Sequence, residues 1–309
     1  MPKENPGAWG SIPSTTLLPG SAFDLMPSIV LNLVLIAFLV ISLGKTQPAC
    51  AAEPTLTIGN GSETRLFTAA ELQARPDGVV LNVQGDIYHG AVPYRAVPLL
   101  AVLKDIFSEK LDTVEASARD GFVSQIPLAL IMRGASEGAV AWIAVEDPVY
   151  PWPSLPNKSE TAGPFYLVWQ YPERSGVSRE QWPYQLTRLT LVESPIHRWP
   201  QLALPDNLPA GSPAQDGQRA FLTHCIACHR LNGGGASGTG PDLARPMSPT
   251  QYFADAGLRA LIRNPRAVRT WPEQHMPGFN KNALSDADLD GIVAYLRVMA
   301  ADLGAAAAK

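Results

Sequence analysis

Cysteine is scarce in this chain of 309 residues, which contains only Cys50, Cys225 and Cys228. No cysteine lies between Cys50 and Cys225, so a metal site within that stretch cannot use a thiolate ligand. An excess of basic charge is absent as well. The chain has 24 Lys and Arg against 28 Asp and Glu and a pI near 5.8, which does not indicate nucleic-acid binding.

Long uncharged apolar runs are also rare, and one occurs near the N-terminus, from Met26 to Leu43. Ala49 and Ala51 flank Cys50 after this run, in the small-x-small pattern of an export-signal cleavage site. We expect residues 1–51 to be a cleaved signal that sends the protein to the periplasm. Two alternatives stay open. The run 26–43 could be retained as an anchor in the inner membrane, because it is just long enough to span a bilayer, or Cys50 could be lipidated.

The other two cysteines lie in the pentapeptide Cys225-Ile226-Ala227-Cys228-His229. C-x-x-C-H is the attachment signature of c-type haem, in which both thiols add to porphyrin vinyl groups and the histidine ligates the iron. The alternatives are a redox dithiol and half of a zinc site. A helix rather than a strand is predicted before Cys225, and no cysteine after Cys228 supplies a second ligand pair. We therefore expect one covalent haem c, with His229 as the proximal ligand.

The haem iron needs a sixth ligand or an open coordination position, and Met276 is our candidate for that ligand. It lies downstream of His229 in His275-Met276-Pro277-Gly278-Phe279. A soft thioether favours reduced iron and raises the potential. The alternatives are His275, which would give a bis-His haem of lower potential, and Met247.

Helices are predicted on both sides of these ligands. Ser212-Pro213 is typical of a helix N-terminus, and the helix would run to His224. The glycine-rich segment 233–240 suits a loop that packs closely along a flat macrocycle. Ser285 and Asp288 resemble a capping box at the start of a last helix. The apolar stripe of that helix is formed by Leu289, Ile292, Val293 and Leu296.

Residues of roughly 210 to 303 resemble a class I, monohaem cytochrome c domain. The resemblance rests on Gly217 and Phe221, the C-x-x-C-H pentapeptide, Gly240-Pro241-Asp242-Leu243, Met276-Pro277 and Tyr295. It implies an all-α cytochrome c domain over residues 212–303. It also implies that Pro241 packs on the proximal side, where its backbone carbonyl would orient the His229 imidazole.

Residues 54–200 are numerous enough to bury a core of their own. Strands are predicted at 56–58, 79–83, 140–145 and 185–192. The segment from Val97 to Ile106 is apolar with helical spacing. Turn-forming residues separate these pieces, which indicates a strand-rich α+β domain. A proline-rich linker over residues 201–211 would join this domain to the helical one, so the fold class is a multidomain chain.

Three segments of this α+β domain resemble the sulfite-oxidase-like molybdopterin-binding fold. They are residues 94–99, 120–128 and 162–169. Active members of that family bind molybdenum through a cysteine thiolate, and residues 54–200 contain no cysteine. Molybdopterin is therefore not expected, and we interpret the domain as a scaffold that docks a partner or positions the haem.

Aromatic and charged residues indicate further contacts. Six aromatic residues are predicted to pack in cores and domain interfaces rather than on a docking surface: Trp152, Trp169, Tyr171, Trp182, Tyr184 and Trp199. The spacing of four arginines would let them share one face, which is either a solvated helix face with some contact to haem propionates or a face that attracts an acidic redox partner: Arg259, Arg263, Arg266 and Arg269. The sequence reveals no role for His224.

These observations favour an exported electron carrier that performs no bond-making chemistry. Its partners would be a dehydrogenase or quinol-oxidising complex as donor and an acceptor such as a terminal oxidase. The alternatives are a molybdenum-type oxidoreductase with a fused haem and a subunit that tethers the haem domain in a respiratory complex.

Overall fold

The computed structural model describes residues 53–83, 87–88, 90–272 and 274–307. The expected signal or anchor at residues 1–51 lies outside these ranges. Residues 53–309 group into one compact unit. Within the described ranges, no helix has the length and hydrophobicity that crossing a membrane requires.

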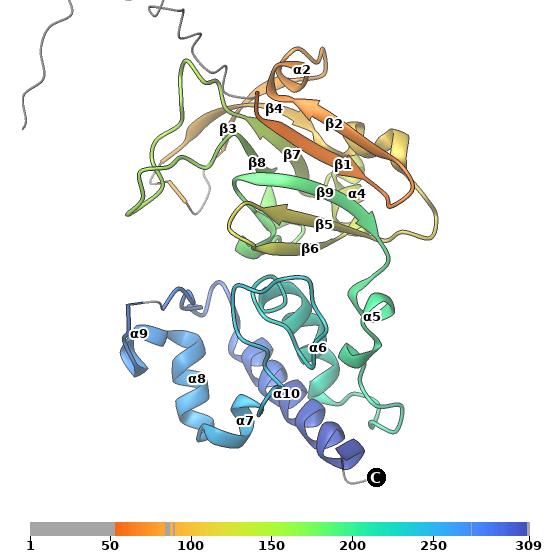
Figure 1. Cartoon of the computed structure of the whole chain (residues 1–309), viewed down its shortest axis with the longest axis vertical. Helices are drawn as coiled ribbons and strands as arrows, with labels where there is room; N and C mark the ends of the chain where they lie inside the picture. Colours follow the sequence, from red (N-terminus) through yellow and green to blue (C-terminus); the bar gives the residue numbers. More distant parts are fainter. Residues whose placement is uncertain (1–52, 84–86, 89, 273, 308–309) are drawn as a thin grey trace, which may run out of the picture. The chain divides into compact units, whose positions relative to one another are not determined.

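The first part of this unit contains two sheets (Figure 1). One has five strands in the order β2-β1-β9-β5-β6, and the other has four in the order β3-β4-β7-β8. The pairing of β1 with β9 is parallel, and the other pairings are antiparallel. The strands are β1 (Thr55–Gly59), β2 (Thr64–Thr68), β3 (Val79–Val83), β4 (Val92–Pro98), β5 (Thr113–Ala118), β6 (Val123–Pro127), β7 (Val140–Val145), β8 (Phe165–Gln170) and β9 (Leu186–Val192).

Short helices connect these strands, and two more, α5 and η5, follow the last strand. The α-helices are α2 (Ala69–Gln73), α3 (Leu99–Leu103), α4 (Leu128–Met132) and α5 (Pro195–Arg198). The 3₁₀ helices are η1 (Lys104–Ile106), η2 (Arg133–Ser136), η3 (Pro172–Arg174), η4 (Arg179–Gln181) and η5 (Pro200–Leu202). We call residues 53–192 the β domain.

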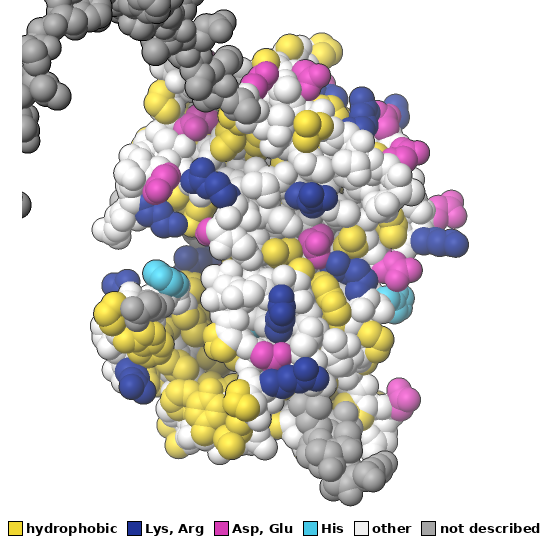
Figure 2. All heavy atoms as spheres, in the orientation of Figure 1, with side chains coloured by type: hydrophobic (Ala, Val, Ile, Leu, Met, Phe, Trp, Pro, Cys, Tyr) yellow, Lys and Arg dark blue, Asp and Glu magenta, His cyan; other side chains and the backbone are white. Residues whose placement is uncertain are grey.

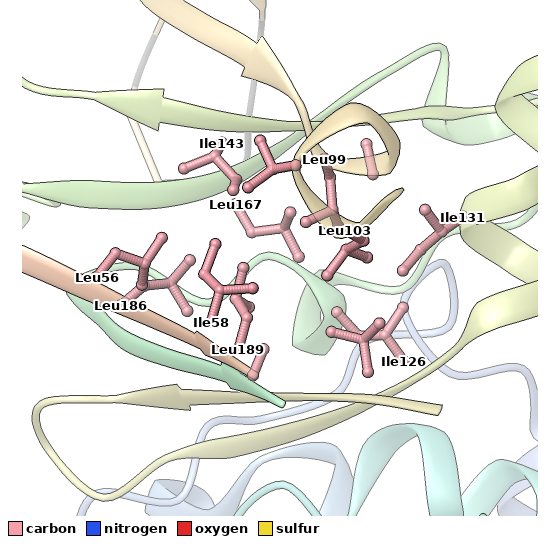
Figure 3. Packing of buried hydrophobic residues seen from close by; sticks show 14 of the residues in the cluster. Leu56, Ile58, Leu99, Leu103, Ile126, Ile131, Ile143, Leu167, Leu186 and Leu189 are labelled. Atoms are coloured by element: carbon pink, nitrogen blue, oxygen red, sulfur yellow. The ribbon is translucent and has the colours of Figure 1, made fainter. Parts of the chain in front are cut away.

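The main core of the β domain lies between the two sheets. Figure 3 shows Leu56, Ile58 and Leu189 of the five-stranded sheet near Ile143 and Leu167 of the four-stranded sheet, and all five side chains are buried. Alternate residues of each strand point to the same face, so one face of each sheet supplies this core.

Strand β8 is buried on both faces, which explains its nearly continuous apolar sequence. Leu167 and Trp169 belong to the core between the sheets, whereas Tyr166 and Val168 belong to a second cluster that also contains Trp152. This double burial makes β8 the most enclosed strand of the four-stranded sheet.

The remainder of the unit is helical. Its helices are α6 (Pro213–His224), α7 (Pro249–Tyr252), α8 (Asp255–Arg263), α9 (Pro265–Val268) and α10 (Asp286–Ala307). Helices α6 and α10 cross where Gly217 meets Gly291, and a Cβ atom on Gly217 would lie 1.8 Å from the Gly291 carbonyl oxygen. The rings of Phe221 and Tyr295 pack beside this crossing with their centroids 5.3 Å apart. The two glycines therefore set how closely the helices approach.

The predicted order of a strand-rich region and a helical region is confirmed. Strands β1, β3, β7 and β9 confirm the four strands predicted from sequence. The predicted helix over 97–106 begins too early. Val97 and Pro98 end β4 and pair with β7, and the helix starts at Leu99. A residue before proline is driven toward extended backbone, which accounts for the later start.

The aromatic side chains largely follow the predicted packing. Trp152 and Trp169 are buried, and Trp182 packs against both clusters of the β domain. Tyr171 is the exception, because it is 43% exposed and has the Arg174 guanidinium over its ring.

The start of the predicted linker and the residues just before it are packed against the two regions. Arg198 donates a 2.7 Å hydrogen bond to Glu115 of β5. Leu202 is fully buried in the core of the helical region, and its carbonyl accepts hydrogen bonds from Tyr295 Oη at 2.6 Å and Gln218 Nε2 at 2.8 Å. Residues 198–202 therefore contact the β domain through Arg198 and the helical region through Leu202.

Candidate functional site

Helix α6 presents the two cysteines of the pentapeptide. Ser212 caps its N-terminus by accepting a hydrogen bond from the Ala214 amide, and the helix ends at His224. The turn continues beyond the helix, since the amides of Cys228 and His229 donate to the Cys225 carbonyl at 3.1 and 2.9 Å. Both thiols and the imidazole therefore project from a single turn of chain.

The thiols are free and partly enclosed. Cys225 and Cys228 do not form a disulfide. Burial raises the pKa of Cys228 to about 11 and raises the pKa of Cys225 further. A redox dithiol needs a thiol of lowered pKa, so these environments do not favour dithiol chemistry. Among the residues that the structure describes, no group of three or more His, Cys, Asp or Glu side chains could hold a metal ion.

The imidazole of His229 is fixed from one side. Its Nδ1 lies 2.8 Å from the carbonyl oxygen of Pro241, so Nδ1 carries the proton and donates it, and the lone pair of Nε2 is free for a metal. Burial lowers the pKa of His229, although the bond to Pro241 opposes this effect, and the ring is therefore neutral at pH 7. This is the contact that the sequence resemblance implies for Pro241.

The backbone next to Pro241 lies against the imidazole ring. A Cβ atom on Gly240 would lie 2.6 Å from Cε1 and 2.7 Å from Nδ1 of His229. Real Cβ atoms essentially never approach this closely, so position 240 requires glycine while the imidazole keeps its place.

Asp242 holds the glycine-rich loop in shape. Its carboxylate accepts hydrogen bonds from the amides of Asn232 at 2.9 Å, Gly233 at 2.6 Å and Ala244 at 2.8 Å. Partial burial raises the pKa of Asp242, but these backbone donors act against burial and the net shift is downward. The carboxylate therefore connects both ends of the loop that carries Pro241.

Met276 is placed differently from its two alternatives. It is half-buried and packs against the core that also contacts Cys225. Met247 is 51% exposed, and His275 is exposed. The chain after Met276 is anchored by buried Phe279, whose amide donates to a carbonyl of α8 at 3.0 Å. Of the three candidates, Met276 alone borders this core.

Several side chains of the helical region fit a porphyrin that bears polar groups at its edge. Leu222, Leu243 and Met276 are apolar and only partly buried against the core, as expected for side chains that border a large flat ligand. Gln274 has both side-chain polar atoms buried without a hydrogen-bond partner among the residues that the structure describes. Such atoms need a partner, and the carboxylates of a haem could supply one.

The four arginines do not share one helical face as the spacing suggested. Helix α8 ends at Arg263, and Asn264-Pro265 interrupts the chain before Arg266, so the four arginines do not lie on one helix. Arg259 pairs with Asp255 and Asp290, and Arg263 pairs with Asp286. Within the described ranges, Arg266 and Arg269 have no acidic partner.

His224 has a partner that sequence analysis missed. Its Nδ1 lies 3.0 Å from Oε2 of Glu180, in η4 of the β domain. The two residues are far apart in sequence, and no local pattern connects them. The only available indication was the position of His224 directly before Cys225.

Comparison with known proteins agrees with this geometry. No curated protein matches the chain. Among protein families, cytochrome c matches residues 214–300, which span α6 to most of α10. The match includes the pentapeptide, Pro241 and Met276. Residues 214–300 are therefore a cytochrome c domain, a haem-based electron carrier.

Proposed function

We propose that the chain transfers single electrons through one haem c, bound covalently by Cys225 and Cys228 and ligated by His229 and Met276. The bound iron would supply the chemistry by alternating between its ferric and ferrous states. The observation that carries the proposal is the Nδ1–carbonyl contact between His229 and Pro241 beside two unpaired thiols. This contact fixes the tautomer and aims the remaining ring nitrogen.

The residues around the iron would have separate roles. Pro241 holds the proton on Nδ1, and burial keeps the His229 ring neutral, so Nε2 retains its lone pair. Met276 supplies a thioether that favours reduced iron. Gln274 is available to hydrogen-bond a carboxylate at the edge of the macrocycle.

Covalent attachment is tested by extracting the purified protein with acidified organic solvent. We expect the haem to stay with the chain, and intact mass to show one haem per chain. The double variant Cys225→Ala/Cys228→Ala should release its haem. Complete extraction of haem from the wild-type protein would refute the proposal.

We propose that the β domain has a sulfite-oxidase-like fold without molybdenum. The support is the set of three similar segments and the absence of any cysteine thiolate between Cys50 and Cys225. Metal analysis of the purified protein should give one iron per chain and no stoichiometric molybdenum. Stoichiometric molybdenum would favour an oxidoreductase with a fused haem.

We propose that redox partners dock where apolar and basic side chains gather on the cytochrome c domain. Figure 2 shows hydrophobic side chains over the region of α7 to α9. Tyr252 and Trp271 are exposed there, and Arg266 and Arg269 lack acidic partners within the described ranges. A mixture of apolar contact and unpaired cations suits an acidic partner, such as a quinol-oxidising complex or a terminal oxidase.

The charge of this surface can be tested with a small anion. The oxidation of ferrous haem by hexacyanoferrate(III) should slow in Arg266→Glu/Arg269→Glu, because two positive charges become negative. Arg188→Glu, at an exposed position of β9, is the control and should have a smaller effect. Equal rates in the two variants would contradict the proposed surface.

We propose that the protein is exported to the periplasm. The support is the apolar run 26–43, the Ala49-Cys50-Ala51 sequence and the attachment signature, since C-x-x-C-H proteins receive their haem outside the cytoplasm. N-terminal sequencing of the mature protein separates cleavage near Ala51 from a retained anchor.

A further inference from the structure

The segment that carries the cysteines contacts the edge of a sheet. Strand β6 is the last strand of the five-stranded sheet, so the amides on its outer side have no strand partner in the described part of the chain. The Val123 amide instead donates a 3.0 Å hydrogen bond to the carbonyl of Ala227, inside the C-x-x-C-H pentapeptide. Beside it, the buried hydroxyl of Ser237 donates to the Gly121 carbonyl at 3.0 Å.

A second contact joins two side chains at the end of α6. Glu180 is 7% exposed, and its Oε2 lies 3.0 Å from Nδ1 of His224. The Ser178 hydroxyl donates to the same carboxylate oxygen, and Arg179 Nε lies 3.7 Å from the other oxygen. A buried carboxylate is costly unless it is paired and hydrogen-bonded, so these three groups determine where Glu180 can lie.

The β domain holds Glu180 rigidly. The Glu180 carbonyl accepts a 2.8 Å hydrogen bond from the buried hydroxyl of Ser124 in β6. The next carbonyl, of Gln181, accepts a 2.7 Å bond from the indole of Trp169, which is fully buried in the core. The carboxylate that reaches His224 therefore belongs to a fixed element rather than to a free surface side chain.

We propose that Glu180 is a positioning residue of the haem site, and that Glu180 and the outer edge of β6 form a surface that docks residues 224–228. Glu180 acts through His224, which directly precedes Cys225, and the Val123 amide fixes the carbonyl between the two cysteines. The β domain thereby keeps the attachment segment in one geometry and closes that side of it to other proteins. This inference rests on the proposed haem attachment.

Two substitutions of Glu180 separate the effect of the carboxylate's position from the effect of its charge. Glu180→Asp keeps the charge but withdraws the carboxylate by roughly 1.5 Å, the length of one carbon–carbon bond, which breaks the contact with His224. Glu180→Gln keeps an acceptor oxygen at the same reach but removes the charge. Glu173→Gln is the matched control, since Glu173 is an exposed acid in the same segment and removing it causes the same charge change.

The measurements are hydrogen exchange at the Val123 amide and the reduction potential of the haem. In Glu180→Asp we expect Val123 to exchange about tenfold faster, as expected for the loss of one buried hydrogen bond, with little change in potential. In Glu180→Gln we expect Val123 to stay protected and the potential to rise, because a negative charge near the haem stabilises ferric iron. Glu173→Gln should leave both quantities near the wild-type values.

Each measurement can overturn the inference. Equal Val123 exchange in the wild type and in Glu180→Asp would overturn the docking role. A Glu180→Gln potential equal to that of Glu173→Gln would show that the Glu180 charge does not act on the haem, and would overturn the role of Glu180 at the haem site. A wild-type protein that binds haem without covalent attachment would refute the proposed attachment, but the Val123 comparison does not depend on the thioether bonds and would still decide the docking.

Discussion

Replacing Gly240 with alanine tests the site at its most crowded point. The backbone of Gly240 does not adopt a positive φ, so alanine can take the same conformation. The added methyl group would lie 2.6 Å from Cε1 and 2.7 Å from Nδ1 of His229, whereas ordinary contacts of a Cβ atom begin at 3.4 Å. The effect of Gly240→Ala is therefore steric, and it acts on the proposed iron ligand.

The size of the effect follows from these distances. The imidazole or the loop must move by roughly 0.8 Å to reach ordinary contact, and a shift of that size exceeds the tolerance of a hydrogen bond. The 2.8 Å bond between His229 and Pro241 would be lost or distorted, at a cost of about 0.5–1.5 kcal/mol. Overpacking adds about 1–3 kcal/mol, so we expect Gly240→Ala to lower the free energy of unfolding by roughly 2–4 kcal/mol.

The assay compares Gly240→Ala with Gly238→Ala, in which the nearest atom to the new methyl group is 4.0 Å away. Denaturant unfolding followed by haem absorbance gives the stability, and redox titration gives the potential. We expect Gly240→Ala to be destabilised and to change its potential, because the histidine is reoriented. Wild-type values for both quantities in Gly240→Ala would refute the proposed role of the His229–Pro241 contact.

Three further predictions follow from the same site. Met276→Ala should abolish the weak far-red absorption band of sulfur-ligated ferric haem, roughly near 695 nm, and lower the potential. Loss of that band in Met247→Ala instead would show that Met247, and not Met276, ligates the iron. Cys225→Ala/Cys228→Ala should leave the cytochrome c domain poorly ordered, which amide exchange would measure against a β domain that still folds. Asp242→Asn should destabilise the protein by about 1 kcal/mol at pH 7, allowing for solvent screening. The folded pKa of Asp242 lies below its ordinary 3.8, so the ionised carboxylate stabilises the folded protein above about pH 4. The difference in free energy of unfolding between the wild type and Asp242→Asn should therefore narrow as the pH falls through the folded pKa. A difference that does not depend on pH would contradict this prediction.

Local patterns predicted local structure well. Ser285 and Asp288 form the predicted N-terminal contact, with the Asp288 amide donating to the Ser285 hydroxyl at 3.0 Å. The alternation in residues 185–192 corresponds to β9, and the Ser212-Pro213 signal corresponds to the start of α6. In each case the interacting residues are only a few positions apart in the chain, so the pattern can be recognised in the sequence itself.

Contacts between distant segments could not be predicted in this way. Spacing suggested one face for Arg263 and Arg266, but Pro265 starts a new helix and separates them. The pairing of Glu180 with His224 depends on how the β domain meets α6. Periodicity and composition describe single elements, and they contain no information about which distant element will supply a buried partner.

The buried position of Leu202 changes where an independent cytochrome c domain would begin. The family match starts at residue 214 and the predicted domain at residue 212, yet Leu202 is fully buried in the helical core and binds Tyr295 through its carbonyl. Trp199 also packs against that core. A fragment beginning at residue 212 would expose the Tyr295 hydroxyl and an apolar cavity of the size of a leucine, at a cost of about 2–5 kcal/mol. The residues joining the two regions thus belong to the core of the second region, and the β domain and the haem site are connected through packed side chains as well as through the chain itself.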